Sequence, residues 1–208
     1  TLETWVFFGT GRYLNGDDVT NKDVQTWYGL IDKGTLPISA ANLRKTDILN
    51  EGPVSGRTVR SIDAYATPGI NGWYMDLKSP VNGAEGERMI EPNFFRGLAL
   101  IGTTRIPEST DVCSPSGKGF TMAIQPFTGG RLPQTFFDIN KDGKFDSNDT
   151  LGGVPVSGIG YESSPNNPIF LGDIMYTSLD DGTSDVMKTN ASASNVRRVS
   201  WREHTRSN

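Results

Sequence analysis

The stretch ALIGTTRIP, residues 99–107, decides the fold because VFFGTGRYL at residues 6–14 repeats its pattern. Each segment has apolar residues, then Gly-Thr, one further residue, Arg and an apolar residue. The shared glycines, Gly9 and Gly102, are 93 positions apart. Alternating short apolar runs that end in Gly-containing turns are typical of β-strands, so the chain is expected to be an all-β protein with an internal repeat.

A second pair of segments gives the length of the repeat. GWYMDLKSPVNG (72–83) and GFTMAIQPFTGG (119–130) share Gly, an aromatic residue, Met and an aliphatic residue, and their glycines are 47 positions apart. A unit of this size is typical of a four-stranded propeller blade, which is stabilised by stacking on its neighbours. The 208 residues hold about 4.4 such units, fewer than most rings contain. We therefore predict that residues 1–208 form part of a β-propeller, with a β-sandwich as the alternative fold.

Composition and charge narrow the class of function. The chain has 35% hydrophobic residues, a net charge of -4 and a pI near 5.0, which fits a globular protein and argues against nucleic acid as a partner. No apolar run approaches the roughly 18 residues that span a bilayer, so no membrane span is expected. The sequence begins with Thr1, and we expect a processed protein or a fragment. Cys113 is the only cysteine, and either a bond to a cysteine elsewhere or a lone thiol fits it.

Helical patterns are scarce in this Gly-rich chain. Short helices are expected at residues 24–28 and 39–50, where Ser39 is a candidate N-cap. The acidic segments at 15–18, 179–182 and 183–185 are interpreted as Asx turns rather than as a second metal site.

The stretch FFDINKDGKFDSND, residues 136–149, carries the strongest chemical signal. Counted from Asp138, oxygen-bearing side chains occupy positions 1, 3, 5, 9 and 12, and Gly143 occupies position 6, as in an EF-hand calcium loop. Ca²⁺ takes six to eight hard oxygen ligands, and the glycine permits the turn that brings them together. The predicted ligands are Asp138, Asn140, Asp142, the Lys144 carbonyl, Asp146 and, with a shorter reach than the usual Glu, Asp149. Strand and loop rather than helices are expected beside this stretch, in LPQTFF before it and TLGGVPVSGIG after it.

Nothing in the sequence indicates catalysis. His204 is the only histidine and lies near the end of the chain, which leaves a Ser-His-Asp, Cys-His or His-ligated zinc centre without its base or ligand. Glu85 and Glu87 are interpreted as residues of a surface turn rather than as a glycosidase pair. The segment GTGR at 9–12 lacks the later residues of a phosphate-binding loop. We therefore predict that the chain is not an enzyme.

Several segments together resemble the C-terminal domain of the PilY/PilC family, proteins associated with the tips of bacterial type IV pili. They occur in the expected order from Trp5 to Glu203 and comprise VFFGTGRYL, YGLIDKG, NGWYMDL, GERMIEP, ALIGTTRIP, FDINKDGKFD and RRVSWRE. The resemblance implies a modified quinoprotein-like propeller with one EF-hand-like loop, and residues 138–149 match its calcium ligands. No Arg-Gly-Asp tripeptide is present, so integrin recognition has no support.

The resemblance also implies a location, partners and a role. The location is the bacterial cell surface or the extracellular pilus tip, associated with the outer membrane after export through the periplasm. The partners are pilins or minor pilins, the rest of the parent chain, and host or abiotic surfaces. The role is pilus biogenesis, in extension against retraction, with surface adhesion and twitching motility.

Two alternatives of another class stay open. One is a fragment of a quinoprotein-like dehydrogenase, in which tryptophans would stack on a quinone cofactor. Trp5, Trp27, Trp73 and Trp201 are instead interpreted as packing residues. The other alternative is a propeller in which calcium is purely structural.

Overall fold

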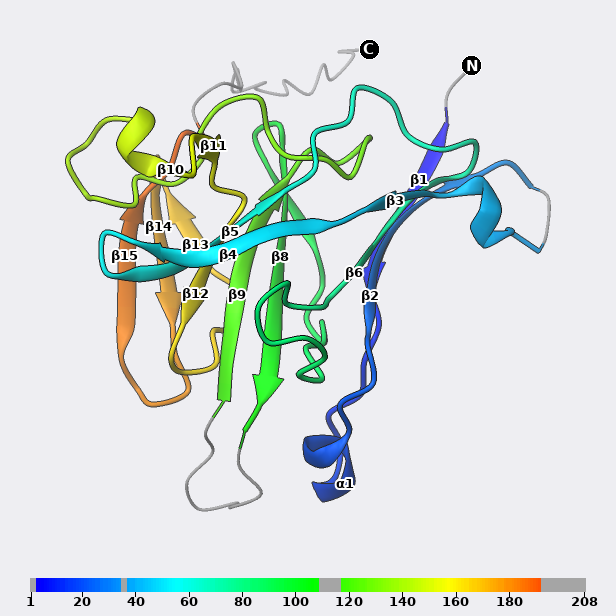
Figure 1. Cartoon of the computed structure of the whole chain (residues 1–208), viewed down its shortest axis with the longest axis horizontal. Helices are drawn as coiled ribbons and strands as arrows, with labels where there is room; N and C mark the ends of the chain where they lie inside the picture. The colour runs from blue at the N-terminus through cyan, green and yellow to red at the C-terminus, as the bar shows by residue number, and fades with distance from the viewer. Residues whose placement is uncertain (1–2, 35–36, 109–116, 192–208) are drawn as a thin grey trace, which may run out of the picture.

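The computed structural model describes residues 3–34, 37–108 and 117–191, and these residues form an all-β arrangement (Figure 1). Four sheets contain the strands, which are connected mainly as antiparallel neighbours. The four-stranded sheet has the order β1 (Thr4–Gly9), β2 (Thr26–Asp32), β6 (Gly72–Asp76) and β3 (Arg44–Thr46), with β3 parallel to β6. The six-stranded sheet has the order β4 (Ile48–Val54), β5 (Arg57–Ile62), β12 (Gly158–Tyr161), β9 (Gly117–Ile124), β8 (Ala99–Pro107) and β7 (Phe94–Arg96).

Smaller elements complete the described part of the chain. A three-stranded sheet contains β13 (Ile169–Leu171), β14 (Ile174–Ser178) and β15 (Ser184–Lys188), and a two-stranded sheet contains β10 (Thr150–Leu151) and β11 (Val154–Pro155). The short helices are α1 (Gly16–Thr20), η1 (Ala40–Asn42) and η2 (Ser147–Asp149).

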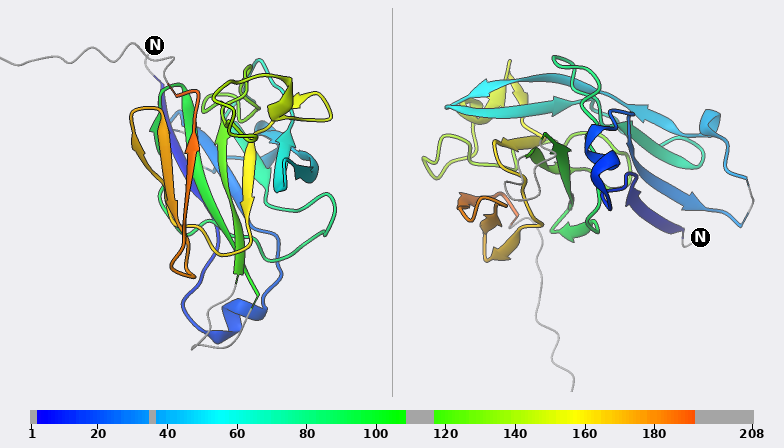
Figure 2. Two further views of the ribbon diagram at one scale, coloured as in Figure 1. Left: turned by 90° about the vertical axis from the view of Figure 1, so that its left-hand side faces the viewer. Right: turned by 90° about the horizontal axis from the view of Figure 1, so that it is seen from below.

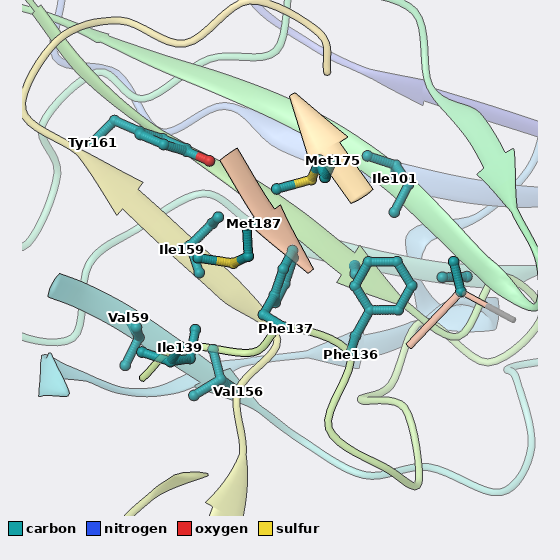
Figure 3. Packing of buried hydrophobic residues seen from close by; sticks show 13 residues of the cluster. Val59, Ile101, Phe136, Phe137, Ile139, Val156, Ile159, Tyr161, Met175 and Met187 are labelled. Carbon is teal, nitrogen blue, oxygen red and sulfur yellow. The ribbon is translucent and has the colours of Figure 1, made fainter. Parts of the chain in front are cut away.

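The six-stranded sheet is the central layer and is covered on both faces. Successive residues of a strand point to opposite faces, so Leu100 of β8 packs with the four-stranded sheet while Ile101 packs with the three-stranded sheet. The first core contains Trp27, Trp73 and Met75, and the second contains Phe137, Met175 and Met187 (Figure 3). Because both faces are buried, ALIGTTRIP has no regularly polar side.

The two outer sheets each leave an apolar face exposed. Val6 and Phe8 of β1 are 48% and 39% exposed, and Phe8 stacks on Tyr28, which stacks on Tyr74. On the far side, the outer face of β13–β15 exposes four apolar residues, namely Ile169, Leu171, Tyr176 and Val186. Figure 2 shows the four-stranded sheet and the three-stranded sheet on opposite sides of the central sheet.

The repeat glycines have a clear packing role. A Cβ on Gly9 would lie 2.3 Å from Met89, and one on Gly102 would lie 2.7 Å from the same side chain. The two glycines therefore admit Met89 between the four-stranded and six-stranded sheets. In the second pair, a Cβ on Gly72 or Gly119 would meet a backbone carbonyl oxygen of the neighbouring strand at 2.0 or 2.1 Å.

The described strands form layered sheets of unequal size and show no closed ring. They do not divide into equal four-stranded units of 47 residues, because the β4–β5 hairpin joins the edge of the central sheet. The layers also number more than the two of a sandwich. The assignment of residues 1–208 to the C-terminal part of a propeller domain stays a prediction.

Both expected helices were wrong. Residues 26–32 are strand β2. Ser39 does accept a hydrogen bond from the Ala41 amide, but only the 3-10 turn η1 follows before β3 and β4. No helix continues beyond this turn because residues 44–46 pair with β6. This pairing overrides the helix propensity of the segment.

Of the acidic segments, 15–18 caps a helix, while Asp181 forms the expected turn. Asn15 and Asp18 form a capping box on α1, in place of the predicted Asx turn. Asp181 accepts hydrogen bonds from the amide and hydroxyl of Thr183. The third segment, 183–185, was wrongly interpreted as a turn, because Asp185 lies in strand β15. None of the three segments gathers a second metal site in the described residues.

Candidate calcium site

The acidic loop starts from a fixed position in the core. Phe137 is fully buried and Ile139 is 2% exposed, both in the cluster under β13–β15. The Asp138 amide donates to the Lys188 carbonyl of β15 at 3.1 Å. The first predicted ligand is therefore held by a backbone hydrogen bond to β15 and by a buried residue on each side of it.

Asp138 organises the turn of the loop. Its side chain is 2% exposed, and its two carboxylate oxygens accept hydrogen bonds from the amides of Asp142 at 3.1 Å and Gly143 at 2.9 Å. Gly143 has φ +84° and Lys141 has φ +60°, the left-handed region that a turn of this tightness requires. Glycine is thus needed at position 6, as the spacing predicted.

Asp149 closes the other end of the loop. It is fully buried, and one carboxylate oxygen accepts from the amides of Ile139 at 2.6 Å and Asn140 at 3.3 Å. The other oxygen accepts from the Asp146 amide at 3.1 Å, so Asp146 and Asp149 form the capping box of η2. The shorter side chain at position 12 therefore does reach both ends of the loop.

The middle of the loop is exposed and bonded within itself. The Asn140 side chain donates to Asp142 at 3.0 Å, and the Lys144 amide donates to the other Asp142 oxygen at 2.8 Å. The hydrogen bond from the Lys144 amide, and then that from Asn140, hold the pKa of Asp142 below its ordinary value. Asp142 is therefore a carboxylate at neutral pH.

The electrostatics of the loop leave negative charge without a cation. Asp138 and Asp149 are buried, yet neither forms a salt bridge with any lysine or arginine of the described chain. Lys188 donates instead to the Gly143 carbonyl at 3.0 Å, and Lys141 pairs with Asp185 of β15 at 3.2 Å. Buried carboxylates bonded to amides alone, with further oxygen donors beside them, have the chemistry that a hard cation such as Ca²⁺ prefers.

The structure gathers the predicted ligands into one loop but does not bring them to one point. Within residues 3–34, 37–108 and 117–191, no three His, Cys, Asp or Glu side chains converge to hold a metal ion. Asp138 lies against Asp142, and Asp149 lies against Asp146, but the carboxylate oxygens face backbone amides. The donor set fits the ion, and the ligand assignment stays a prediction.

A second buried acidic group was missed by the sequence analysis, and Glu87 was wrongly placed in a surface turn. Glu87 is 1% exposed and pairs with Arg60 at 2.7 Å, while Glu51 pairs with the same guanidinium at 2.6 Å. Arg60 also lies 3.4 Å from the ring centre of Phe120. Burial alone would lower the pKa of Arg60, but the charges of Glu87 and Glu51 raise it above its ordinary value. The only hint in the sequence was a charged residue among apolar ones in RTVRSI.

The tryptophans that the dehydrogenase alternative requires are packing residues where they are described. Trp27 and Trp73 are fully buried, and their ring centres are 5.7 Å apart. The indole of Trp27 donates a hydrogen bond to the Asn93 side chain, and that of Trp73 donates to the Pro126 carbonyl. Trp5 packs at the margin of the same core. Trp201, His204, Cys113 and the SWRE segment lie outside the described residues.

Comparison with known proteins identifies the family of the chain. It is 54% identical, over 204 residues and 98% of its length, to a type IV pilus biogenesis factor PilY1 homologue of Xylella fastidiosa (strain Temecula1). The chain belongs to the PilY1 family. PilY1 of Pseudomonas aeruginosa (strain PAO1) is 30% identical over 165 residues, or 68% of the chain. No family model matches the chain.

The crystal structure of the P. aeruginosa PilY1 C-terminal domain is similar with a TM-score of 0.71 and 22% identity, covering 90% of this chain and 41% of that one. This similarity shows that the chain shares the fold of part of the PilY1 domain. The chain spans 17% of the X. fastidiosa relative and 14% of the P. aeruginosa one. In the described residues, no helix is long and apolar enough to cross a membrane.

Proposed function

We propose that this chain is a calcium-binding module of a type IV pilus biogenesis factor. The observation that carries the proposal is the 54% identity to a PilY1 homologue over 98% of the chain. The relatives are named as pilus biogenesis factors, and a role in pilus biogenesis is the function that the whole parent protein would have.

Calcium would be held by Asp138, Asn140, Asp142, the Lys144 carbonyl, Asp146 and Asp149. The support is the pair of buried carboxylates, Asp138 and Asp149, which have amide partners and no lysine or arginine partner within the described part of the chain. When bound, the ion would supply that charge and draw the exposed middle of the loop inward, because oxygens at positions 3 and 5 would turn toward it. Occupancy would thereby order the loop, a local electrostatic change of the kind that biases larger rearrangements.

The sheet stack would be an arc of a modified propeller that the rest of the parent protein completes. Its two end faces are apolar and exposed, at Phe8 with its tyrosine neighbours and at Ile169 with Leu171. The similar crystal structure is more than twice as long as the aligned part, and the corresponding part of the parent protein would cover both faces.

The finer roles follow from the family. The parent protein would act at the bacterial cell surface or pilus tip, contact pilins or minor pilins, and influence extension against retraction, adhesion and twitching motility. Host or abiotic surfaces are further candidate partners. A purely structural calcium ion is the competing interpretation.

A calorimetric titration of chelator-stripped protein tests the calcium site. One site in the sensor range, about 10⁻⁷ to 10⁻⁵ M, is expected, and Asp142→Ala should weaken it at least about tenfold. Asp181→Ala, another exposed turn aspartate, is the matched control and should bind like the parent. Equal binding by Asp142→Ala and the parent, or no binding by the folded parent, would refute the proposed site.

Twitching assays on the same variants in cells separate regulation from structure. If calcium regulates, Asp142→Ala should alter motility while the protein accumulates at parental levels. If calcium is purely structural, motility should fall only in proportion to the loss of protein.

A further inference from the structure

The acidic loop is attached to the tip of the β4–β5 hairpin from two sides. On the first side, Lys141 pairs with Asp185 of β15 at 3.2 Å, and Asp185 pairs with Arg57 of β5 through both carboxylate oxygens, at 2.6 and 2.8 Å. On the second side, Leu151 of β10, directly after the loop, lies over Gly52 of β4. The loop is therefore linked to this hairpin from Lys141, through Asp185, and from Leu151, just beyond its last residue.

Asp185 is the shared member of the first attachment. Its side chain is 10% exposed, whereas Lys141 is 52% exposed and free of other ion pairs in the described chain. Lys141 also has φ +60°, a conformation that costs energy for a residue other than glycine. The ion pair with Asp185 holds this residue within the turn that carries Asn140 and Asp142.

Arg57 connects the same carboxylate to the central sheet. Its guanidinium lies 5.8 Å from the ring centre of Tyr161 on β12, and Tyr161 belongs to the buried core. Its side chain is 22% exposed, so its pairing with Asp185 is partly protected from solvent screening. A change in loop geometry can thus reach the hairpin through one chain of contacts.

We propose that Asp185 is a positioning residue for the acidic loop, through which the order of the loop and the order of the β4–β5 hairpin tip depend on each other. The calcium-dependent part of this inference rests on the proposed function, and the coupling itself does not. If calcium orders the loop, reciprocity requires that an ordered hairpin also favours calcium binding.

Hydrogen exchange in chelator tests the coupling without calcium. In the full chain, Asp185→Asn should speed exchange of amides in both 139–145 and 52–58 by about threefold, the factor expected when partly exposed ion pairs are lost. Lys141→Gln leaves the Asp185–Arg57 pair intact but should also speed exchange in both segments, because the hairpin tip loses the support of the loop, and Lys141→Arg should behave like the parent. Asp181→Asn, in the turn of the same sheet, is the control. Unchanged exchange in either segment of Asp185→Asn would overturn the proposal.

Calcium affinity provides a second test whose sign is diagnostic. Removing a lysine from an acidic loop should tighten calcium binding by about threefold if charge alone matters, because the lysine repels the ion. Our proposal predicts the opposite, because the Lys141–Asp185 ion pair positions the loop. Lys141→Gln should bind calcium about threefold more weakly, and Lys141→Arg should bind it normally. Tighter binding by Lys141→Gln would overturn the proposal. If the parent binds no calcium, the calcium site fails while the exchange experiment still decides the coupling.

Discussion

Two of the regions in which the described chain buries carboxylates provide different partners for them. In the central sheet, Glu51 and Glu87 share the guanidinium of Arg60, which is itself fully buried under the Phe120 ring. In the acidic loop, Asp138 and Asp149 are as deeply buried, but among the described residues their partners are backbone amides alone. One region contains its own cation, while the other provides oxygen atoms that an external cation could use.

The difference shows how stability and ligand response can be separated within one fold. A buried ion pair is fixed by the sequence, and its loss leaves an uncompensated charge. Amide-bonded carboxylates in a loop can persist without an ion and gain stability when one binds. The Arg60 region should therefore determine whether the protein folds, and the loop should determine how the folded protein responds to calcium.

The largest expected effect comes from removing the internal cation. Arg60→Met should lower the free energy of unfolding by about 3–5 kcal/mol, because two buried carboxylates lose their partner. Urea unfolding with and without the added change Glu87→Gln measures it, and the double variant should recover part of the loss. A loss below about 1 kcal/mol would mean that Glu51 and Glu87, like Asp138 and Asp149, do not depend on a cation within the chain.

Calcium should have the next largest effect and should act only through the loop. At a concentration of about 100 times Kd, the ion should raise the free energy of unfolding by about 2.7 kcal/mol, because it binds the folded state. Urea unfolding in calcium and in chelator measures this difference. Asp142→Asn should lose most of the gain, while Glu87→Gln should retain it. If the calcium effect depended on Glu87, the Arg60 region rather than the acidic loop would determine the response to calcium.

A smaller effect is expected from the ring that covers Arg60. Phe120→Leu should cost about 1–2 kcal/mol through lost packing and lost contact with the guanidinium. The cost should be smaller in an Arg60→Met background, because the contact is then already absent. Equal costs in both backgrounds would show that the ring does not contribute to the charge site.

The smallest effect concerns pH. The folded-state pKa of Asp142 is lowered, so its contribution to stability is present above the unfolded pKa near 4 and is lost as pH falls through the folded value. In chelator, the difference in Tm between the parent and Asp142→Asn should shrink as pH is lowered from 5 toward 2. A difference that stays constant over this range would show that Asp142 is not stabilised as a carboxylate.

The sequence predicted local features better than long-range ones. The all-β class was predicted from strands such as ALIGTTRIP, and the role of Gly143 in the turn was predicted from the loop spacing. Both features depend on residues that are neighbours in the sequence. The helix expected at 39–50 failed because β3 pairs with β6 far along the chain. Glu87 was missed for the same reason, since its partner Arg60 is 27 residues away and no local pattern links them.

The membership in the PilY1 family was predicted from ordered motifs and is confirmed by the comparisons. The six calcium ligands were predicted from spacing, and the structure places them in one loop. Their binding of calcium stays a prediction. What spacing could not show was the attachment of that loop to β15 and β5, because Asp185 and Arg57 belong to strands outside the motif.

Met89 has a consequence for redox chemistry. Its side chain is 3% exposed and fills the space left by Gly9 and Gly102, and its sulfur accepts a hydrogen bond from Asn93 at 2.8 Å. Conversion to the sulfoxide would add a polar oxygen where two sheets leave no room. The folded protein should therefore shield this thioether from peroxide, and any Met89 sulfoxide that does form would mark molecules in which the seam between the sheets had opened.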